Sequence, residues 1–511
     1  MGLNKGSRTI NVSKNITTAF IKETVTLVLA FLSRKLFIEY IGVEYLGISG
    51  LFANILRLLS LADLGLGNAM NVSLYKPIVE NDTDKIAALL GFYRKLYRII
   101  AVAVFVIGMG LLPFLQYLVN LDSNIPYIRV YYICYIFHNV ASYLYVYKTA
   151  LLRADQKTYL ANKVNIVAQF GTVILQIVSI IFLHSYLAYL LIGIASVLAC
   201  NVALSNIADR QYGFLNKKVA LSKSEEKGIF TNVSSMFLYK ISWTVMTGTD
   251  NVLMSVLFGT IYVGFYSNYH AVTSSLESFI ALIFTALTAS IGNLVATAND
   301  ERRFETFQTV QLVSFWTSAF VSVCLFFLMQ DFIQLLFGKE LMLDDLTVFA
   351  MVLNTFFTIS MRPVWAFREG TGMFRRIRYI MLYTAALNLI LSVVLAKLIG
   401  LSGILFATSI SKLCTHFWYE PNILFREFFH QKVWRYYGPF LQNVVMILFC
   451  GAICGGILSF VKTVSVWNWL LKAMVCTIVV NGIYFFRYYK SPAFLDLLFR
   501  VKMVLGRKAA N

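Results

Sequence analysis

The feature that most constrains this chain is a series of long apolar blocks separated by short polar segments. The blocks run for roughly 18 to 26 residues, about the length that an α-helix needs to cross a hydrocarbon core of ~30 Å. Hydrophobic residues make up 59% of the 511, charged residues only 14%, and the mean hydropathy is +0.70. A soluble domain is about a quarter charged. The pattern predicts an all-α polytopic membrane protein and excludes a transmembrane β-barrel, whose short segments would alternate in polarity.

The apolar blocks and the breakers between them predict about fourteen transmembrane helices. We expect these helices near 16–40, 46–70, 97–119, 126–147, 164–183, 186–207, 229–257, 263–293, 310–330, 346–367, 379–397, 402–424, 438–461 and 466–487. The stretch before the first of them is polar and basic and is not followed by the cleavage pattern of a signal peptide. We therefore expect the first helix to be retained.

The net charge of +19 follows from where the loops carry their lysines and arginines. Most of the 44 basic residues fall in alternate loops, near 5–14, 76–98, 148–163, 210–227, 302–303, 368–378 and 426–435 and in the tail. The opposite loops hold only Lys339, Lys397 and Lys462. The positive-inside rule then predicts that both termini are cytoplasmic and that the helix count is even. Nucleic acid is not needed to explain the charge.

The chain also carries a weak internal repeat. With a shift of 217 residues, NITTAF (15–20) falls on NVSSMF (232–237) and GVEYLG (42–47) falls on GTIYVG (259–264). Six helices separate the copies, so we expect two parallel halves related by an axis along the membrane normal. The predicted parts are a six-helix bundle at 1–207, a cytoplasmic linker at 208–228, a second six-helix bundle at 229–424, and two more helices with a basic tail at 425–511.

Several charged residues fall inside the predicted spans. The first helix carries Lys22, Glu23 and Arg34, and further basic residues at depth are Arg57, Lys240 and Lys412. Each costs roughly 2.5–3.5 kcal/mol at a helix centre on insertion scales, so such residues usually face a polar cavity. Internal ion pairs that lock helices together are one explanation. Because basic residues outnumber acidic ones at mid-depth, a transported anion is the other.

The stretch YLGISGLFANILRLLSLADLGLGNAM (45–70) shows this most clearly. Arg57 lies about 18 Å from the expected outer end of its helix, close to the midplane. Asp63 lies nearer the cytoplasm and suits a counter-charge at the inner mouth. The segment from Gly65 to Gly67 is expected to weaken the inner end of the helix and allow bending, because glycine is a poor helix former.

No feature of the sequence indicates an enzyme. The five histidines are scattered, there is no His-Glu-x-x-His motif, and no glycine-rich phosphate loop or nucleotide-binding domain is found. The seven cysteines lie in apolar segments, and we interpret them as packing residues rather than a metal site. The chain has no loop long enough for a soluble catalytic domain.

The run SRKLFIEYIGVEYLGISGLFANILRLLSLADLGLGNAM, followed by SLYKPIVENDTDKI and FYRKLYR, resembles the Wzx-type polysaccharide transporter family of the MOP superfamily. The stretches YKISWTVMTGTDNVLMSVLFGTIYVGFYSNY and FTALTASIGNL resemble its second half. The last two helices match least. The superfamily also contains MATE drug exporters and lipid II flippases. The resemblance implies a V-shaped pair of six-helix bundles around a central cavity that opens alternately to each side.

It further implies a flippase for undecaprenyl-diphosphate-linked oligosaccharides in the bacterial cytoplasmic (inner) membrane, serving O-antigen, capsule, exopolysaccharide or teichoic-acid-like assembly. A polysaccharide polymerase and other assembly proteins would be its partners. The expected head-group ligands are Arg34, Arg57 and Lys240, then Lys22 and Lys412; Glu23, Asp63, Asp250 and Glu277 are candidates for counter-charges or ion coupling. No cofactor is expected, and a proton gradient, a sodium gradient or concentration alone could drive transport. The alternatives are a MATE-like cation-coupled exporter and a non-transporting assembly subunit.

Overall fold

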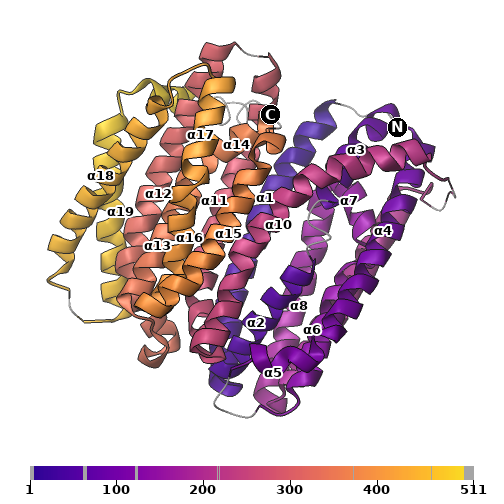
Figure 1. Ribbon diagram of the computed structural model, residues 1–511, viewed down its shortest axis with the longest axis horizontal. Helices are drawn as coiled ribbons and strands as arrows, with labels where there is room; N and C mark the ends of the chain where they lie inside the picture. Colours follow the sequence, from indigo (N-terminus) through magenta and orange to yellow (C-terminus); the bar gives the residue numbers. More distant parts are fainter. Residues whose placement is uncertain are drawn as a thin grey trace. The chain divides into compact units, whose positions relative to one another are not determined.

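The computed structural model describes residues 5–60, 66–120, 125–215, 217, 219–297, 299–371, 373–461 and 463–499, and all regular structure in these ranges is helical. The chain divides into two compact units, Met1–Ser267 and Asn268–Asn511. Each unit is described by itself, with the helix labels of Figure 1.

The first unit contains α1 to α10 and the beginning of α11. Their bounds are α1 Lys5–Tyr40, α2 Val43–Leu59, α3 Leu66–Glu80, α4 Thr83–Gly110, α5 Leu115–Leu118, α6 Ile128–Ser142, α7 Val146–Ala154, α8 Thr158–Leu183, α9 Tyr186–Gln211, α10 Lys223–Phe258 and α11 Thr260–Thr297, with a 3₁₀ turn at Leu112–Phe114. Its core around α2 includes Leu51, Phe52 and Tyr132, none of which is exposed.

The second unit contains the rest of α11 and the remaining helices. Their bounds are α12 Asp300–Phe337, α13 Asp345–Ser360, α14 Arg362–Thr371, α15 Phe374–Ile399, α16 Leu401–Cys414, α17 His416–Glu427, α18 Trp434–Leu458 and α19 Val466–Tyr488, with a 3₁₀ turn at Lys339–Leu341. One of its cores joins α12, α18 and α19 and contains Cys450, Cys454 and Cys476, which are fully buried among apolar side chains. These three cysteines therefore pack as predicted.

The predicted helix ranges all fall on helical structure, and one of them needs correction. The expected single helix at 46–70 is two helices, because α2 ends at Leu59 and α3 begins at Leu66. The Ser60 hydroxyl donates to the Leu56 carbonyl at 2.7 Å and so satisfies one of the acceptors that the helix end leaves free. Asp63 and the bend expected at Gly65 lie outside the described residues.

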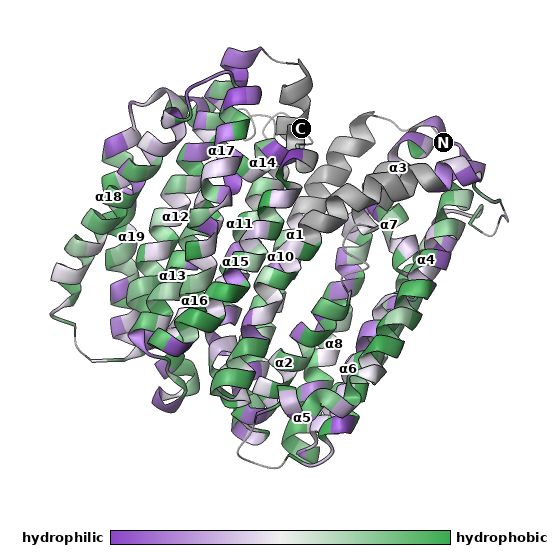
Figure 2. Cartoon of the chain, in the orientation of Figure 1, coloured by the Kyte–Doolittle hydropathy of each residue, from purple (hydrophilic) through white to green (hydrophobic). Residues whose placement is uncertain are grey.

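Eight of the described helical stretches are long enough and apolar enough to cross a membrane. They are Thr83–Leu118, Thr158–Leu183, Tyr186–Gln211, Asp300–Phe337, Asp345–Glu369, Tyr379–Ile399, Trp434–Leu458 and Val466–Tyr488. Figure 2 shows hydrophobic residues along the middle of these helices and more hydrophilic residues toward helix ends. The protein is thus an all-helical, multi-pass membrane protein, and the number of crossings stays a prediction.

Helix starts recur along the chain at a nearly constant interval. Each of three helix starts has a counterpart 217 residues later: Val43 and Thr260, Thr83 and Asp300, and Ile128 and Asp345. The residues before the first pair, Gly42 and Gly259, both have a φ of 110°. Before the second pair, the side chains of Asp82 and Asn299 both accept a hydrogen bond from the first helical turn.

Candidate functional site

The guanidinium of Arg34 lies within the first unit, on the last third of α1. Arg34 is half-buried, and its Nη1 donates a hydrogen bond to the Ser267 hydroxyl at 2.9 Å. Ser267 in turn donates to the Gly264 carbonyl at 2.7 Å, which fixes the hydroxyl oxygen as an acceptor. A neutral hydroxyl orients the guanidinium without cancelling its charge, so Arg34 stays suited to binding an anion.

Arg57 lies in the last turn of α2 and has a different environment. The opposite face of α2 is buried through Leu51, Ile55 and Leu56, whereas Arg57 and Ala53, one turn earlier, are both exposed. Among the described residues, the Arg57 guanidinium makes no hydrogen bond and no ion pair. The C-terminal end of a helix also favours a positive charge, because its last carbonyls carry partial negative charge.

A close backbone contact holds α2 against the turn between α10 and α11. A Cβ atom added to Gly47 would lie 2.2 Å from the Thr260 carbonyl oxygen, and one added to Gly264 would lie 2.6 Å from the Val43 carbonyl oxygen. The contact is reciprocal, because Gly47 and Gly264 are themselves 217 residues apart, as are Val43 and Thr260. Only glycine allows two backbones to approach this closely.

The other candidates of the first unit are not gathered with these two arginines by any contact that the structure describes. Lys22 and Glu23 form an ion pair with each other at 3.3 Å, so this pair is partly self-compensating. Asp250 is buried in α10, with 8% of its surface exposed, and Ser33, 217 residues earlier, is buried to the same extent. Lys240 lies on α10, but its side chain is outside the described residues, as is Asp63.

The second unit contains a group of charged side chains that we call the buried charged cluster: Glu277, Arg362, Arg368, Lys412, His416 and Glu420. Glu277 of α11 interacts electrostatically with Lys412 and Arg362. The Arg368 Nη1 lies 2.9 Å from the Glu420 Oε2, and both side chains are at most 4% exposed. His416 lies in the fields of Lys412 and Arg368. Lys412, a predicted head-group ligand, is therefore near a carboxylate of its own unit.

Sequence reasoning missed most of this cluster. Arg368 was expected in a cytoplasmic basic loop at 368–378; that placement is wrong, because Arg368 belongs to α14 and is 3% exposed. Glu420 compensates its charge from α17. The available signal was Glu420 itself, an acidic residue inside the predicted span 402–424, which needed a basic partner.

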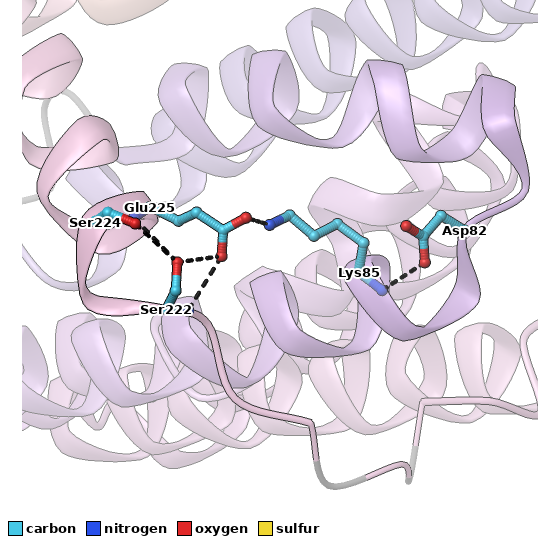
Figure 3. A network of polar contacts seen from close by, with 5 residues as sticks. All are labelled: Asp82, Lys85, Ser222, Ser224 and Glu225. Carbon is cyan, nitrogen blue, oxygen red and sulfur yellow. Dashed lines mark hydrogen bonds and ion pairs between the residues drawn. The ribbon is translucent and has the colours of Figure 1, made fainter.

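Charged contacts also tie the predicted linker to the turn between α3 and α4. Figure 3 shows Lys85, at the start of α4, reaching Glu225 in the first turn of α10, while the Lys85 backbone amide donates to Asp82 at 2.9 Å. Glu225 and Ser222 also form the capping box of α10. The hydrogen bonds from Lys85 and Ser222 lower the pKa of Glu225 to about 2. Lys217 adds a second ion pair, at 2.6 Å from Asp84.

Comparison with known proteins gives the fold a context. No protein-family model and no curated protein matches the chain. Among solved structures, the lipid II flippase MurJ in an inward closed conformation matches with a TM-score of 0.65 and 12% identity, covering 92% of this chain and 98% of MurJ. An inward-facing multidrug resistance MATE transporter of the MOP superfamily matches with a TM-score of 0.58 and 15% identity, covering 78% of this chain and 95% of its own. A mutant of the Vibrio cholerae MATE transporter VcmN matches with a TM-score of 0.56 and 13% identity, covering 84% and 100%. The chain therefore has the fold of the MOP superfamily.

Proposed function

We propose that the chain is a flippase that moves undecaprenyl-diphosphate-linked oligosaccharides across the bacterial cytoplasmic membrane for surface polysaccharide assembly. The observation that carries the proposal is Arg57, an exposed arginine in an apolar helix of a membrane protein. On a lipid-facing surface near mid-depth it would cost roughly 2.5–3.5 kcal/mol on insertion scales. A water-filled path that receives an anion removes most of that cost.

The chemistry of a diphosphate suits these residues. A guanidinium presents a planar fork of donors that matches phosphate oxygens, and it stays charged in a membrane cavity. Arg57 offers its donors within the described part of the chain, and Arg34 is held by a neutral hydroxyl. Lys240, Lys22 and Lys412 are the further head-group candidates. Of these, Lys22 and Lys412 have acidic neighbours, so Arg34 and Arg57 are the stronger pair.

The proposed architecture is two parallel six-helix halves, at 1–207 and 229–424, joined by the 208–228 linker and followed by two helices and a cytoplasmic tail. The recurring helix starts and the reciprocal glycine contact support this duplication. Alternating access between the halves would let the head group cross while the polyprenyl tail stays in lipid. The fold shared with the lipid II flippase MurJ also supports a lipid-linked cargo.

Carboxylates in the membrane are the candidates for coupling to a proton or sodium gradient. Glu277 is the best placed among those described, because Lys412 and Arg362 lie within its electrostatic reach. Protonation of Glu277 would leave both cations uncompensated and so favour a rearrangement. Glu23, Asp63 and Asp250 remain further candidates.

The experiment replaces Arg57 in cells whose surface polysaccharide depends on this protein. In the Arg57→Ala variant we expect export to fall about tenfold or more, because a charge-assisted hydrogen bond of ~1.5–3 kcal/mol is lost. Lipid-linked oligosaccharide should accumulate on the cytoplasmic side. The Arg57→Lys variant keeps the charge but not the fork and should be intermediate.

The matched control is Arg376→Ala. The Arg376 side chain is 66% exposed and pairs only loosely with Glu427, at 3.7 Å, so its loss should leave export unchanged. Membrane levels of all variants are compared by quantitative blotting. Wild-type export by Arg57→Ala at a normal level in the membrane would overturn the proposed role of Arg57.

A MATE-like exporter is the second candidate, favoured by the fold shared with two MATE transporters. An exporter of organic cations needs acidic groups on its path. The discriminating measurement is the accumulation of a cationic dye in cells with and without the protein. Dye efflux without any change in polysaccharide export would favour the exporter.

A further inference from the structure

The first unit contains a pocket of about 440 Å³ that the charged residues do not use. Its walls come from three places in the chain, namely the end of α1 with the start of α2, the start of α6, and the turn between α8 and α9. Five tyrosines line it: Tyr40, Tyr45, Tyr127, Tyr131 and Tyr186. Pockets of ~300–1,000 Å³ are the size that binds small molecules. We call it the tyrosine pocket.

The floor of the tyrosine pocket is rigid. The rings of Tyr131 and Tyr186 meet edge to face with centroids 4.8 Å apart, and those of Tyr45 and Tyr186 do the same at 5.0 Å. The Tyr186 hydroxyl forms a hydrogen bond with the Ser49 hydroxyl at 2.7 Å. Interlocked rings of this kind hold one geometry, so the floor is preorganised for a ligand.

The rim of the pocket presents open ring faces instead. Tyr127 is 73% exposed and Tyr40 is 40% exposed, and the Tyr40 ring stacks on His184 with centroids 5.8 Å apart. Tyr127 and His184 both have positive φ angles, 61° and 44°, which non-glycine residues adopt rarely. Two such residues on one rim show that the loop geometry, and not local preference, sets the direction of these side chains.

The lining chemistry selects the ligand. None of the ten described lining residues is an aspartate, glutamate, lysine or arginine, so the pocket does not match a diphosphate or a metal ion. Phenol rings offer apolar faces together with hydroxyls. A sugar ring has the complementary surface, since its axial C–H groups form an apolar face and its equatorial hydroxyls form hydrogen bonds. An acyl chain would leave the hydroxyls without partners.

The position of the pocket fits the cargo as well. Tyr40 follows Arg34 by six residues on α1, ~9 Å along the helix axis. Phe37, between them, contacts the Tyr186 ring with centroids 5.7 Å apart. A diphosphate at Arg34 would therefore place the next sugars of a linked chain near the pocket. The predicted orientation puts this end of α1 on the outer side of the membrane.

We propose that the tyrosine pocket binds an uncharged sugar ring of the translocated glycan on the outer side of the membrane, beyond the first sugar. The inference rests on the proposed flippase function. It assigns the specificity for the glycan to Tyr40 and Tyr127 of the first unit, apart from the arginines that would bind the diphosphate.

The test measures transport in proteoliposomes of two lipids, undecaprenyl diphosphate bearing the complete oligosaccharide and the same lipid bearing its first sugar only. The variants are Tyr127→Asn, which removes the ring but tolerates positive φ, and Tyr40→Ala. We expect both to slow the complete lipid about fivefold, the loss of one aromatic contact, and to leave the short lipid unchanged. Tyr127→Phe should transport the complete lipid nearly as well as the wild type, because it keeps the ring.

Two controls separate the possible failures. Tyr117→Asn removes an equally exposed tyrosine of α5, 70% exposed and outside the pocket, and should transport both lipids normally. Arg57→Ala should slow both lipids. If the tyrosine variants match the wild type, or slow both lipids equally as a site for an acyl chain would, the sugar pocket is overturned while the flippase proposal stands. If the wild-type protein moves neither lipid, the flippase proposal itself fails.

Discussion

The two units hold their helices together by different means. In the second unit, Arg368 and Glu420 form an ion pair that is almost completely buried. In the first unit, the tightest contact has no side chains at all, since Gly47 and Gly264 bring two backbones together. Arg57 of the first unit is meanwhile exposed. The difference indicates that buried charge stabilises the second unit, while the first unit keeps a cation available for a ligand.

The largest expected effect comes from breaking the buried ion pair. Arg368→Ala leaves the Glu420 carboxylate buried without compensation and should lower the free energy of unfolding by about 3–5 kcal/mol. Thermal unfolding of the purified protein in detergent measures it. A double variant, Arg368→Met with Glu420→Leu, should recover most of the loss. Unfolding of Arg368→Ala at the wild-type temperature would show that the pair does not stabilise the second unit.

A smaller effect is expected at the glycine contact of the first unit. Gly47→Ala places a methyl group 2.2 Å from the Thr260 carbonyl oxygen, so the backbones must separate, at a cost of about 1–3 kcal/mol. Gly171→Ala is the control, because a Cβ atom there meets nothing within 4 Å. The same unfolding assay applies. Equal stability of both variants would contradict a close contact.

The contact between Lys85 and Glu225 should contribute less than either, because it is a surface ion pair. The folded-state pKa of Glu225 is about 2, below the unfolded value of ~4.3, so its contribution is present above pH ~4.3 and is lost as the pH falls toward 2. We expect Glu225→Gln to narrow its stability difference from the wild type over that range. Melting curves from pH 7 to pH 3 measure it. A difference that grows on acidification would contradict the sign.

The smallest effect on stability is expected at Arg57. Its side chain is exposed, so Arg57→Ala should change the free energy of unfolding by less than about 0.5 kcal/mol even as transport falls. Unfolding and transport measured on one preparation separate the two roles. Destabilisation comparable with Arg368→Ala would mean that Arg57 is structural and that the contrast between the units is wrong.

The sequence predicted the helices better than their contacts. Hydropathy and length locate a membrane helix because the bilayer imposes both, and the predicted ranges fall on helical structure. The end of α2 at Leu59 was missed, because the residues after it, Leu61 and Ala62, are as apolar as those before it.

The candidate site was predictable only in part. Single charged residues at depth, such as Arg57 and Arg34, stand out in a hydrophobic sequence. The partnership of Arg368 with Glu420 joins residues 52 positions apart, and no spacing rule connects them. The tyrosine pocket is harder still, since Tyr40, Tyr127 and Tyr186 lie in separate segments where tyrosines are ordinary interface residues.

The reciprocal contact of Gly47 with Thr260 and of Gly264 with Val43 has a mechanical consequence. Interdigitated side chains resist both sliding and turning, whereas two bare backbones in contact fix the separation of the helices and leave their crossing angle nearly free. The contact is therefore shaped like a bearing, with one surface supplied by each copy of the repeat. A chain built from two such copies carries both halves of its own pivot.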